Sequence, residues 1–199
     1  MSLTSTFITV AGPTGAGKSL LVNRSIEAEP ENRGVLQLDH YYKTADQVPA
    51  YAGYNNFDHP DALALDQLAD DMTTLSQGRP ITPPTVPEHY TAIRRAKRDD
   101  THAPQPVMFI EGFLSLYNSE IRKLTDYAVW VTAEKSVRLR RRKERSGLDR
   151  KYVNEVLLPM EKQFLLATKQ YADSVLDTTK DTPDQAYRKF RRELKAYLN

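Results

Sequence analysis

Residues 12–19 read GPTGAGKS, which places a glycine, a lysine and a serine at the end of the pattern G-x-x-x-x-G-K-S. Glycine lets the backbone turn its N–H groups inward around a phosphate, and the amides at a helix N-terminus add partial positive charge. Lys18 would reach the β- and γ-phosphates of a nucleotide, and the Ser19 hydroxyl would take one position on Mg²⁺. The stretch predicts a nucleoside triphosphate site formed by Gly12, Pro13, Thr14, Gly15, Ala16, Gly17, Lys18, Ser19 and Leu20.

The segments on both sides of this loop support the interpretation. Residues 7–11 are apolar and β-branched, as expected for a buried strand. Beyond the loop, Leu21, Val22 and Ile26 fall on one side of a helix. A phosphate-binding loop lies between a strand and a helix, whereas an ordinary glycine-rich turn needs neither these flanks nor the Lys-Ser pair.

Two acidic residues follow other strand-like segments. Residues 35–38 predict a second strand followed by Asp39, and residues 107–110 predict a third strand that ends in Glu111. The carboxyl ends of parallel strands line the ligand crevice of an α/β sheet, so both carboxylates are expected near the phosphates. Asp39 would orient an attacking hydroxyl and accept its proton, or else serve as a metal-shell or structural acid. Glu111 would hold Mg²⁺ directly or through water, unless it faces solvent.

The rest of the pattern predicts the elements that position these groups. Residues 127–131 and 175–176 read as two further strands, and residues 65–75 as an amphipathic helix. Residues 152–172 predict a longer helix with a kink or a restart at Pro159. The sequence therefore predicts the α/β class, as a P-loop NTPase with a mainly parallel five-stranded sheet and helices on both faces.

Two segments carry additional expectations. The last helix opens at Thr182 and Pro183, with Gln185 at capping-box spacing, and would pack Ala186, Phe190 and Leu194 inward. Residues 44–57 show neither a helical nor a strand period, and a loop of that length is usually functional or disordered. With no internal repeat and no linker, we expect a single domain over residues 1–199.

The composition excludes several classes of protein. The 199 residues are 40% hydrophobic and 27% charged, as in ordinary globular proteins, and contain no run of about 18 apolar residues. We therefore expect no membrane partner, and the N-terminus does not predict a signal peptide. The chain has no cysteine, which excludes disulfides, thiolate metal sites and a cysteine nucleophile and fits a cytoplasmic protein.

A strongly basic segment follows the fourth predicted strand. Arg138, Arg141 or Arg142, and Arg145 share one face of a helix, and Gly147 ends it. Guanidinium groups on this face would suit the charge of phosphate oxygens, and a solvated charged face is the alternative. Nucleic-acid binding is not expected, because the segment lacks interleaved aromatic residues for base stacking.

Together these motifs resemble the uridine kinase family of P-loop kinases, in the wider group that includes phosphoribulokinase. The likeness rests on GPTGAGKS at Gly12, LDHYYK at Leu38, NFDHPDA at Asn56, IEGFL at Ile110 and TKQYAD at Thr168. The resemblance covers about residues 7–176. It implies transfer of the γ-phosphate of ATP to the 5′-hydroxyl of a nucleoside, most simply uridine or cytidine, with Mg²⁺ as cofactor.

The resemblance also implies an arginine-bearing helical lid at about residues 138–152, with Arg142 and Arg145 as its arginines, and roles for single residues. Asp39 matches the catalytic carboxylate, Asp58 the residue that binds the ribose hydroxyls, and Tyr42 a pocket aromatic. Capping ahead of Pro60 is the alternative for Asp58, and packing is the alternative for Tyr42. The predicted catalytic residues are Asp39, Lys18 and Arg142; Arg145 joins the phosphate loop in binding nucleotide; the substrate residues are Asp39, Tyr42, Asp58, Tyr90, Arg95 and Arg142; and the metal residues are Ser19 and Glu111.

The chain departs from the family in the segment that contacts the nucleobase of the substrate. Uridine kinases follow a proline-rich stretch with Pro-x-Tyr-Asp and then His-x-Arg. Here Tyr90 and Arg95 stand in for the tyrosine and arginine, and the later histidine is missing. The segment between Arg145 and Tyr152 is also shorter than the lid of the family. A change in base-contacting polar groups can change the substrate.

Alternative acceptors therefore stay open. They include nicotinamide riboside, another ribonucleoside or a small phosphosugar, since EGFL and the pair Pro159-Met160 also resemble nicotinamide riboside kinases. A nucleotide-gated binding module with slow hydrolysis is the alternative from another class. Homo-oligomers are compatible with the sequence.

Overall fold

The computed structural model describes residues 5–84, 101–147 and 149–198. Its main sheet holds five strands in the order β2-β5-β1-β6-β7, and every pairing between neighbours is parallel. The strands are β1 (Thr6–Ala11), β2 (Arg33–Gln37), β5 (Val107–Glu111), β6 (Tyr127–Thr132) and β7 (Ser174–Asp177). The predicted five parallel strands are confirmed, with ends that differ by up to two residues.

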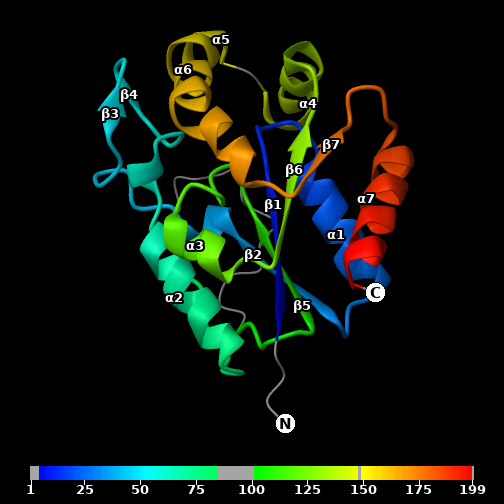
Figure 1. Cartoon of the computed structure of the whole chain (residues 1–199). Coiled ribbons are helices and arrows are strands. Elements are labelled where there is room, and N and C mark those ends of the chain that lie inside the picture. The colour runs from blue at the N-terminus through cyan, green and yellow to red at the C-terminus, as the bar shows by residue number, and fades with distance from the viewer. Residues whose placement is uncertain (1–4, 85–100, 148, 199) are drawn as a thin grey trace.

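Helices cover both faces of this sheet, as the sequence predicts (Figure 1). On one face, α1 (Lys18–Ala28) and α7 (Pro183–Leu198) pack over a core that includes Ile8 and Phe109. On the other face, α2 (Leu65–Ser76) and α3 (Ser119–Leu124) pack over a core that includes Phe7 and Trp130. Successive strand residues point to opposite faces, and both faces are covered, so the central strands are continuously apolar.

The amphipathic patterns of the two long helices are confirmed. The predicted apolar face of α2 is buried, and so is that of α7. At the start of α7, the Thr182 N–H donates to Gln185 Oε1 at 2.9 Å, and Gln185 N–H donates to Thr182 Oγ1 at 3.3 Å. This reciprocal pair is the predicted capping box. Every helix among residues 5–84, 101–147 and 149–198 is too short or too polar to cross a membrane.

The helical segment around Pro159 is more irregular than a kinked α-helix. It runs through α5 (Arg150–Tyr152), the π-helical turn η4 (Val153–Leu157), α6 (Leu158–Met160), a second π-helical turn η5 (Glu161–Leu165) and the 3₁₀ turn η6 (Leu166–Tyr171). Proline has no N–H and its ring crowds the preceding turn, and widened π turns relieve that crowding. Together with α4 (Lys135–Ser146), this segment lies at the end of the sheet toward which β6 points (Figure 1).

The expectation that residues 44–57 lack strands is wrong. A small antiparallel hairpin forms there from β3 (Ala50–Tyr51) and β4 (Tyr54–Asn55). Its turn residues Ala52 and Gly53 both have positive φ, at 51° and 79°, which matches the twist of a two-residue hairpin. Strands of two residues are too short to show an alternating pattern, so the sequence could not reveal them.

Candidate active site

The predicted phosphate loop connects β1 to α1, and helix α4 packs directly against it. A Cβ atom on Gly15 would lie 2.3 Å from the backbone oxygen of Arg138 in α4, so only glycine allows this approach. Gly17 has a φ of 104° at the N-cap of α1, a conformation that L-residues with a side chain rarely adopt. Lys18 is buried, with Nζ 3.3 Å from the Pro13 oxygen. The glycines thus set a loop shape over which the lysine folds.

The two predicted carboxylates lie beside this loop. Glu111 ends β5, and Asp39 follows the neighbouring strand β2 within the 3₁₀ turn η1 (Leu38–Tyr41). Ser19 Oγ donates to Glu111 Oε1 at 3.2 Å. Burial raises the pKa of the Glu111 carboxyl to about 7, and burial also raises the pKa of Asp39. Burial lowers the pKa of Lys18, whereas the nearby Glu111 and Asp39 charges act to raise it.

This cluster fits a Mg²⁺ ion. A hydroxyl and carboxylates are the hard oxygen ligands that Mg²⁺ prefers, and Ser19 and Glu111 already lie within hydrogen-bonding distance. The negative charge of Asp39 adds to the cost of ionising Glu111, and a bound cation would relieve that repulsion. Among the described residues, no group of three or more His, Cys, Asp or Glu residues that could hold a metal occurs.

Asp58 lies between β4 and the 3₁₀ turn η2 (Pro60–Ala62), and it lines one cavity together with Asp39 and Glu111. It accepts a hydrogen bond from the Tyr152 hydroxyl at 2.6 Å, and its pKa is raised by burial, against the opposing effects of Tyr152 and Arg142. The cap of η2 comes instead from His59, which accepts from the Asp61 N–H. The capping alternative for Asp58 is therefore wrong, and its carboxylate faces the cavity.

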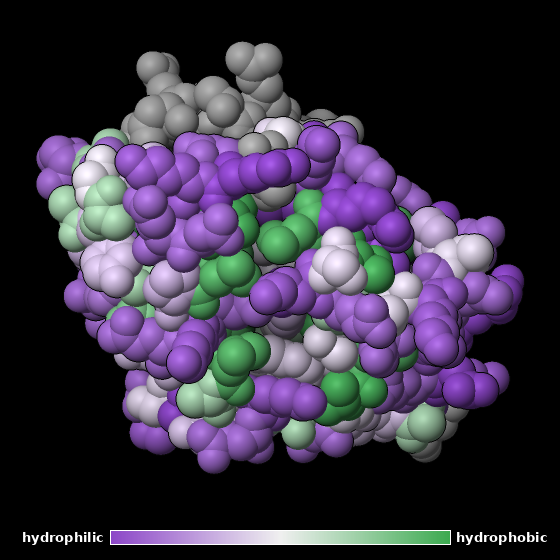
Figure 2. All heavy atoms as spheres, turned by 90° about the horizontal axis from the view of Figure 1, so that it is seen from above, coloured by the Kyte–Doolittle hydropathy of each residue, from purple (hydrophilic) through white to green (hydrophobic). Residues whose placement is uncertain are grey.

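We call the space lined by Asp39, Asp58 and Glu111 the central cavity. Figure 2 looks onto this end of the molecule and shows hydrophobic residues surrounded by hydrophilic ones. Tyr42, which the sequence placed in the pocket, lines the cavity and packs edge-on against Phe57 with 5.6 Å between ring centroids. The lining residues that the sequence predicted are Thr14, Lys18, Ser19, Asp39, Tyr42, Asp58, Glu111, Arg142 and Arg145.

The arginines of α4 divide into two kinds. Arg138 is buried, donates to the Thr14 oxygen and forms a two-point ion pair with Glu161 at 2.7 and 3.0 Å. Arg141 donates to Thr178. Arg142 Nη1 donates to Thr14 Oγ1 at 3.1 Å, and both Arg142 and Arg145 line the central cavity. The reading of this helix as a purely solvated face is wrong, because its first arginine is an internal anchor.

A second space, which we call the outer cavity, adjoins the central cavity at the phosphate loop. Its volume is about 760 Å³. It lies between the loop, α1, α4 and the start of α7, and Arg145 lines both cavities. Thr14, Lys18 and Ser19 of the loop also line both cavities, so the loop is common to the two spaces.

Some predicted residues fall outside the site as described, and some site residues were not predicted. Tyr90 and Arg95 lie outside the described residues. Tyr152, Glu161 and Thr178 were not predicted, although Glu161 directly follows the Pro159-Met160 pair that the sequence singled out. Tyr152 reaches Asp58 across 94 positions of sequence, and no local pattern records such a contact.

Comparison with known proteins agrees with this geometry. The phosphoribulokinase / uridine kinase family model matches residues 7–185. The chain belongs to this family. It is therefore a P-loop kinase, a phosphotransferase that acts on a hydroxyl group.

Curated relatives in the family share about a third of their residues with this chain. A uridine kinase of Deinococcus deserti is 34% identical over 180 residues, covering 85% of this chain and 86% of the relative. A uridine kinase of Staphylococcus epidermidis is 30% identical over 181 residues, covering 86% of each. The phosphate loop and both strand-end carboxylates lie within residues 7–185, the range matched by the family model.

Solved structures agree on the fold. A structure described as a possible uridine kinase from Bacillus stearothermophilus superposes with a TM-score of 0.61 at 15% identity, covering 88% of this chain and 90% of that one. A shikimate kinase from Acinetobacter baumannii superposes with a TM-score of 0.52 at 15% identity, covering 98% and 94%. At this identity the likeness concerns the α/β architecture alone.

Proposed function

We propose that this protein transfers the γ-phosphate of ATP to the 5′-hydroxyl of a nucleoside, uridine or cytidine first among them, and that residues 1–199 act as one kinase domain. The observation that carries the proposal is a single cavity lined by the phosphate loop, by Asp39 and Glu111 and by Asp58. A triphosphate tail and a sugar would meet in that cavity. The uridine kinase relatives support the choice of acceptor.

On the donor side, the loop amides and Lys18 would hold the β- and γ-phosphates. The outer cavity has a volume in the range of small-molecule sites and would receive the nucleoside part of ATP. Ser19 and Glu111 would hold Mg²⁺, which when bound supplies positive charge to the β- and γ-phosphate oxygens. Arg145 lines both cavities, so its guanidinium would contact the phosphate both while ATP is bound and during transfer.

On the acceptor side, Asp58 would accept hydrogen bonds from the two ribose hydroxyls, and Tyr42 would pack against the sugar. Asp39 would orient the 5′-hydroxyl and accept its proton as the oxygen attacks phosphorus. The transition state spreads charge over the equatorial phosphoryl oxygens, and Lys18 and Arg142 would stabilise that charge. Positioning and charge neutralisation thus account for the rate.

Further expectations belong to the proposal. Tyr90 and Arg95 would contact the base, and the missing histidine of the family leaves base preference as the property most open to change. We expect a cytoplasmic protein and allow for a homo-oligomer. We expect no nucleic-acid partner.

The test is ADP release measured against a panel of acceptors with ATP and Mg²⁺. The panel contains uridine, cytidine, purine ribonucleosides, nicotinamide riboside and a phosphosugar. Turnover should require a nucleoside and should fall by about 10²- to 10⁴-fold in Asp39→Asn, with ADP affinity retained. ATP hydrolysis that is indifferent to every acceptor would contradict the proposal and favour a nucleotide-gated binding module.

A further inference from the structure

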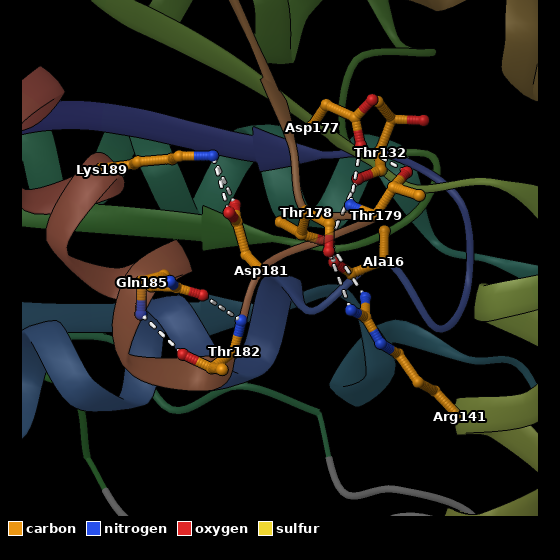
Figure 3. Close-up of polar contacts among 10 residues, drawn as sticks. All are labelled: Ala16, Thr132, Arg141, Asp177, Thr178, Thr179, Asp181, Thr182, Gln185 and Lys189. Atoms are coloured by element: carbon orange, nitrogen blue, oxygen red, sulfur yellow. Dashed lines mark hydrogen bonds and ion pairs between the residues drawn. The ribbon is translucent and has the colours of Figure 1, made fainter.

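A buried threonine outside the predicted site contacts the phosphate loop directly. Thr178 is the first residue after β7 and is 2% exposed. Its Oγ1 donates to the backbone oxygen of Ala16 at 2.8 Å, and its N–H donates to the Thr132 oxygen at 2.9 Å (Figure 3). Thr178 therefore joins the phosphate loop to the end of β6, across 162 positions of sequence.

Arg141 of α4 determines which group accepts the proton of the Thr178 hydroxyl. Its Nη1 donates to Thr178 Oγ1 at 2.9 Å, and its Nη2 donates to the Thr178 oxygen at 2.8 Å (Figure 3). The Thr132 oxygen already accepts the Thr178 N–H and lies 3.2 Å from Oγ1, farther than Ala16. Since the guanidinium occupies a lone pair of Oγ1, the hydroxyl proton is directed to Ala16.

This hydrogen bond orients one peptide of the phosphate loop. The carbonyl and the N–H of a trans peptide point in opposite directions, so an Ala16 oxygen held toward Thr178 turns the Gly17 N–H away from it. Gly17 is the N-cap of α1, where amides of the loop would meet phosphate. Glycine is conformationally permissive, so the orientation of this peptide depends on a restraint from outside the loop.

We propose that Thr178 and Arg141 are positioning residues for the triphosphate, which orient the 16–17 peptide of the phosphate loop through the relay from Arg141 to Thr178 to the Ala16 oxygen. Neither residue needs to touch the reacting atoms. Because Arg141 belongs to the helix that carries Arg142 and Arg145, the relay also links the base of the lid to the loop it covers. The inference rests on the proposed ATP-dependent activity. Thr178 and Arg141 also line the outer cavity, and the role proposed for them here is to orient the loop peptide that meets the phosphates.

The surrounding loop is held by other contacts. Asp177 accepts from the Thr179 N–H at 2.8 Å, and the Glu134 N–H donates to Thr179 Oγ1 at 2.9 Å. Lys189 pairs with Asp181 at 2.7 Å, and the capping box follows (Figure 3). Removing the Thr178 hydroxyl should therefore leave the loop in place, and its effect should concentrate on the phosphate loop.

The test compares Thr178→Val, Thr178→Ser and the matched control Thr179→Val. Thr178→Val should raise the KM for ATP and the dissociation constant of ADP about tenfold, the value of one lost hydrogen bond to a buried carbonyl. It should leave kcat and the KM for the nucleoside within about twofold. Thr178→Ser keeps the hydroxyl and should restore ADP affinity. Thr179→Val removes one contact of the surrounding loop but leaves the relay from Arg141 to Ala16, so its ADP affinity should match that of the parent protein.

Two further measurements make the result decisive. Arg141→Met should weaken ADP binding about threefold, and the double variant with Thr178→Val should bind no more weakly than Thr178→Val alone, because both act through one relay. Thermal unfolding of each variant separates this effect from a general loss of stability. ADP affinity unchanged in Thr178→Val, or lost equally in Thr179→Val, would overturn the inference. ADP binding needs no acceptor, so failure of the proposed nucleoside phosphorylation would be seen separately.

Discussion

The two sides of the central cavity are built in different ways. On the side of the phosphate loop, the contacts end on main-chain atoms: α4 packs on the Gly15 backbone, and the Thr178 hydroxyl donates to the Ala16 oxygen. On the side of Asp58, short irregular elements meet through side chains, with the Tyr152 hydroxyl on Asp58 and the ring of Tyr54 against that of Tyr152. A contact that ends on the main chain constrains the path of the loop itself, whereas a contact between two side chains is lost when either one is substituted.

This difference suggests how one fold serves several acceptors. The half that receives the donor keeps its shape because glycines define the path of the loop and the Thr178 hydroxyl restrains its main chain. The half that receives the acceptor consists of the β3–β4 hairpin, η2 and the π-helical segment, and its hydrogen bonds come from side chains. We expect substitutions in the first half to abolish turnover and substitutions in the second to alter the choice or affinity of the acceptor.

The largest effect should come from Lys18→Met, which removes the buried charge and keeps the length of the side chain. We expect kcat to fall by roughly 10³-fold or more, because charge on the transferring phosphoryl loses its closest lysine. The KM for the nucleoside should change by less than about threefold. Steady-state kinetics with both substrates varied measures both values. A parallel rise in the KM of the nucleoside would show that the two halves do not act separately.

The buried Glu111 carboxyl should make the stability of the protein depend on pH. The pKa of Glu111 is raised by burial from 4.5 to about 7, so between these values the folded protein binds more protons at Glu111 than the unfolded chain. The ligand-free protein should therefore lose stability as pH rises from 4.5 to about 7, by up to about 3 kcal/mol.

Denaturant unfolding at several pH values in the presence of a chelator checks this expectation. Glu111→Gln carries no titrating group and should give a flatter dependence over the same range. Mg²⁺ with ADP should likewise flatten the dependence of the parent protein, because a bound cation favours the ionised carboxylate. A Glu111→Gln protein with the same slope as the parent would assign the pH dependence to other groups.

The smallest effect should come from Tyr152→Phe on the acceptor side. Loss of its hydrogen bond to Asp58 should raise the KM for the nucleoside about fivefold and leave the KM for ATP unchanged. Because the Tyr152 hydroxyl opposes the rise in the pKa of Asp58, its removal should move the acidic limb of kcat/KM for the nucleoside to higher pH. Tyr54→Phe, on the ring that packs against Tyr152, is the matched control and should leave both KM values within about twofold.

The sequence predicted the parts of the site that local patterns record. The phosphate loop follows from the glycine, lysine and serine spacing, and Asp39 and Glu111 follow from their places after apolar strands. Parallel strands bring their carboxyl ends to one edge, so the meeting of these residues could be inferred from topology alone. The hairpin at residues 50–55 could not, because its strands of two residues have no period to detect.

The arginines of α4 show what helical spacing in the sequence cannot predict. Helical spacing predicts which residues share a face, but it does not say what that face meets. In the folded chain Arg138 pairs with Glu161, Arg141 binds Thr178, and Arg142 and Arg145 line the central cavity. Four similar side chains thus acquire different surroundings from elements far away in sequence.

By itself, the sequence determined the five strands of the main sheet, the long helices α2 and α7, the phosphate loop and the two carboxylates that follow strands, because each depends on neighbours a few residues away. Only the tertiary structure decided that Tyr152 bonds Asp58 and that Thr178 holds the Ala16 carbonyl, since these pairs lie 94 and 162 positions apart. A hydrogen bond at that separation depends on how whole elements pack, and hydrophobic periodicity carries no record of it.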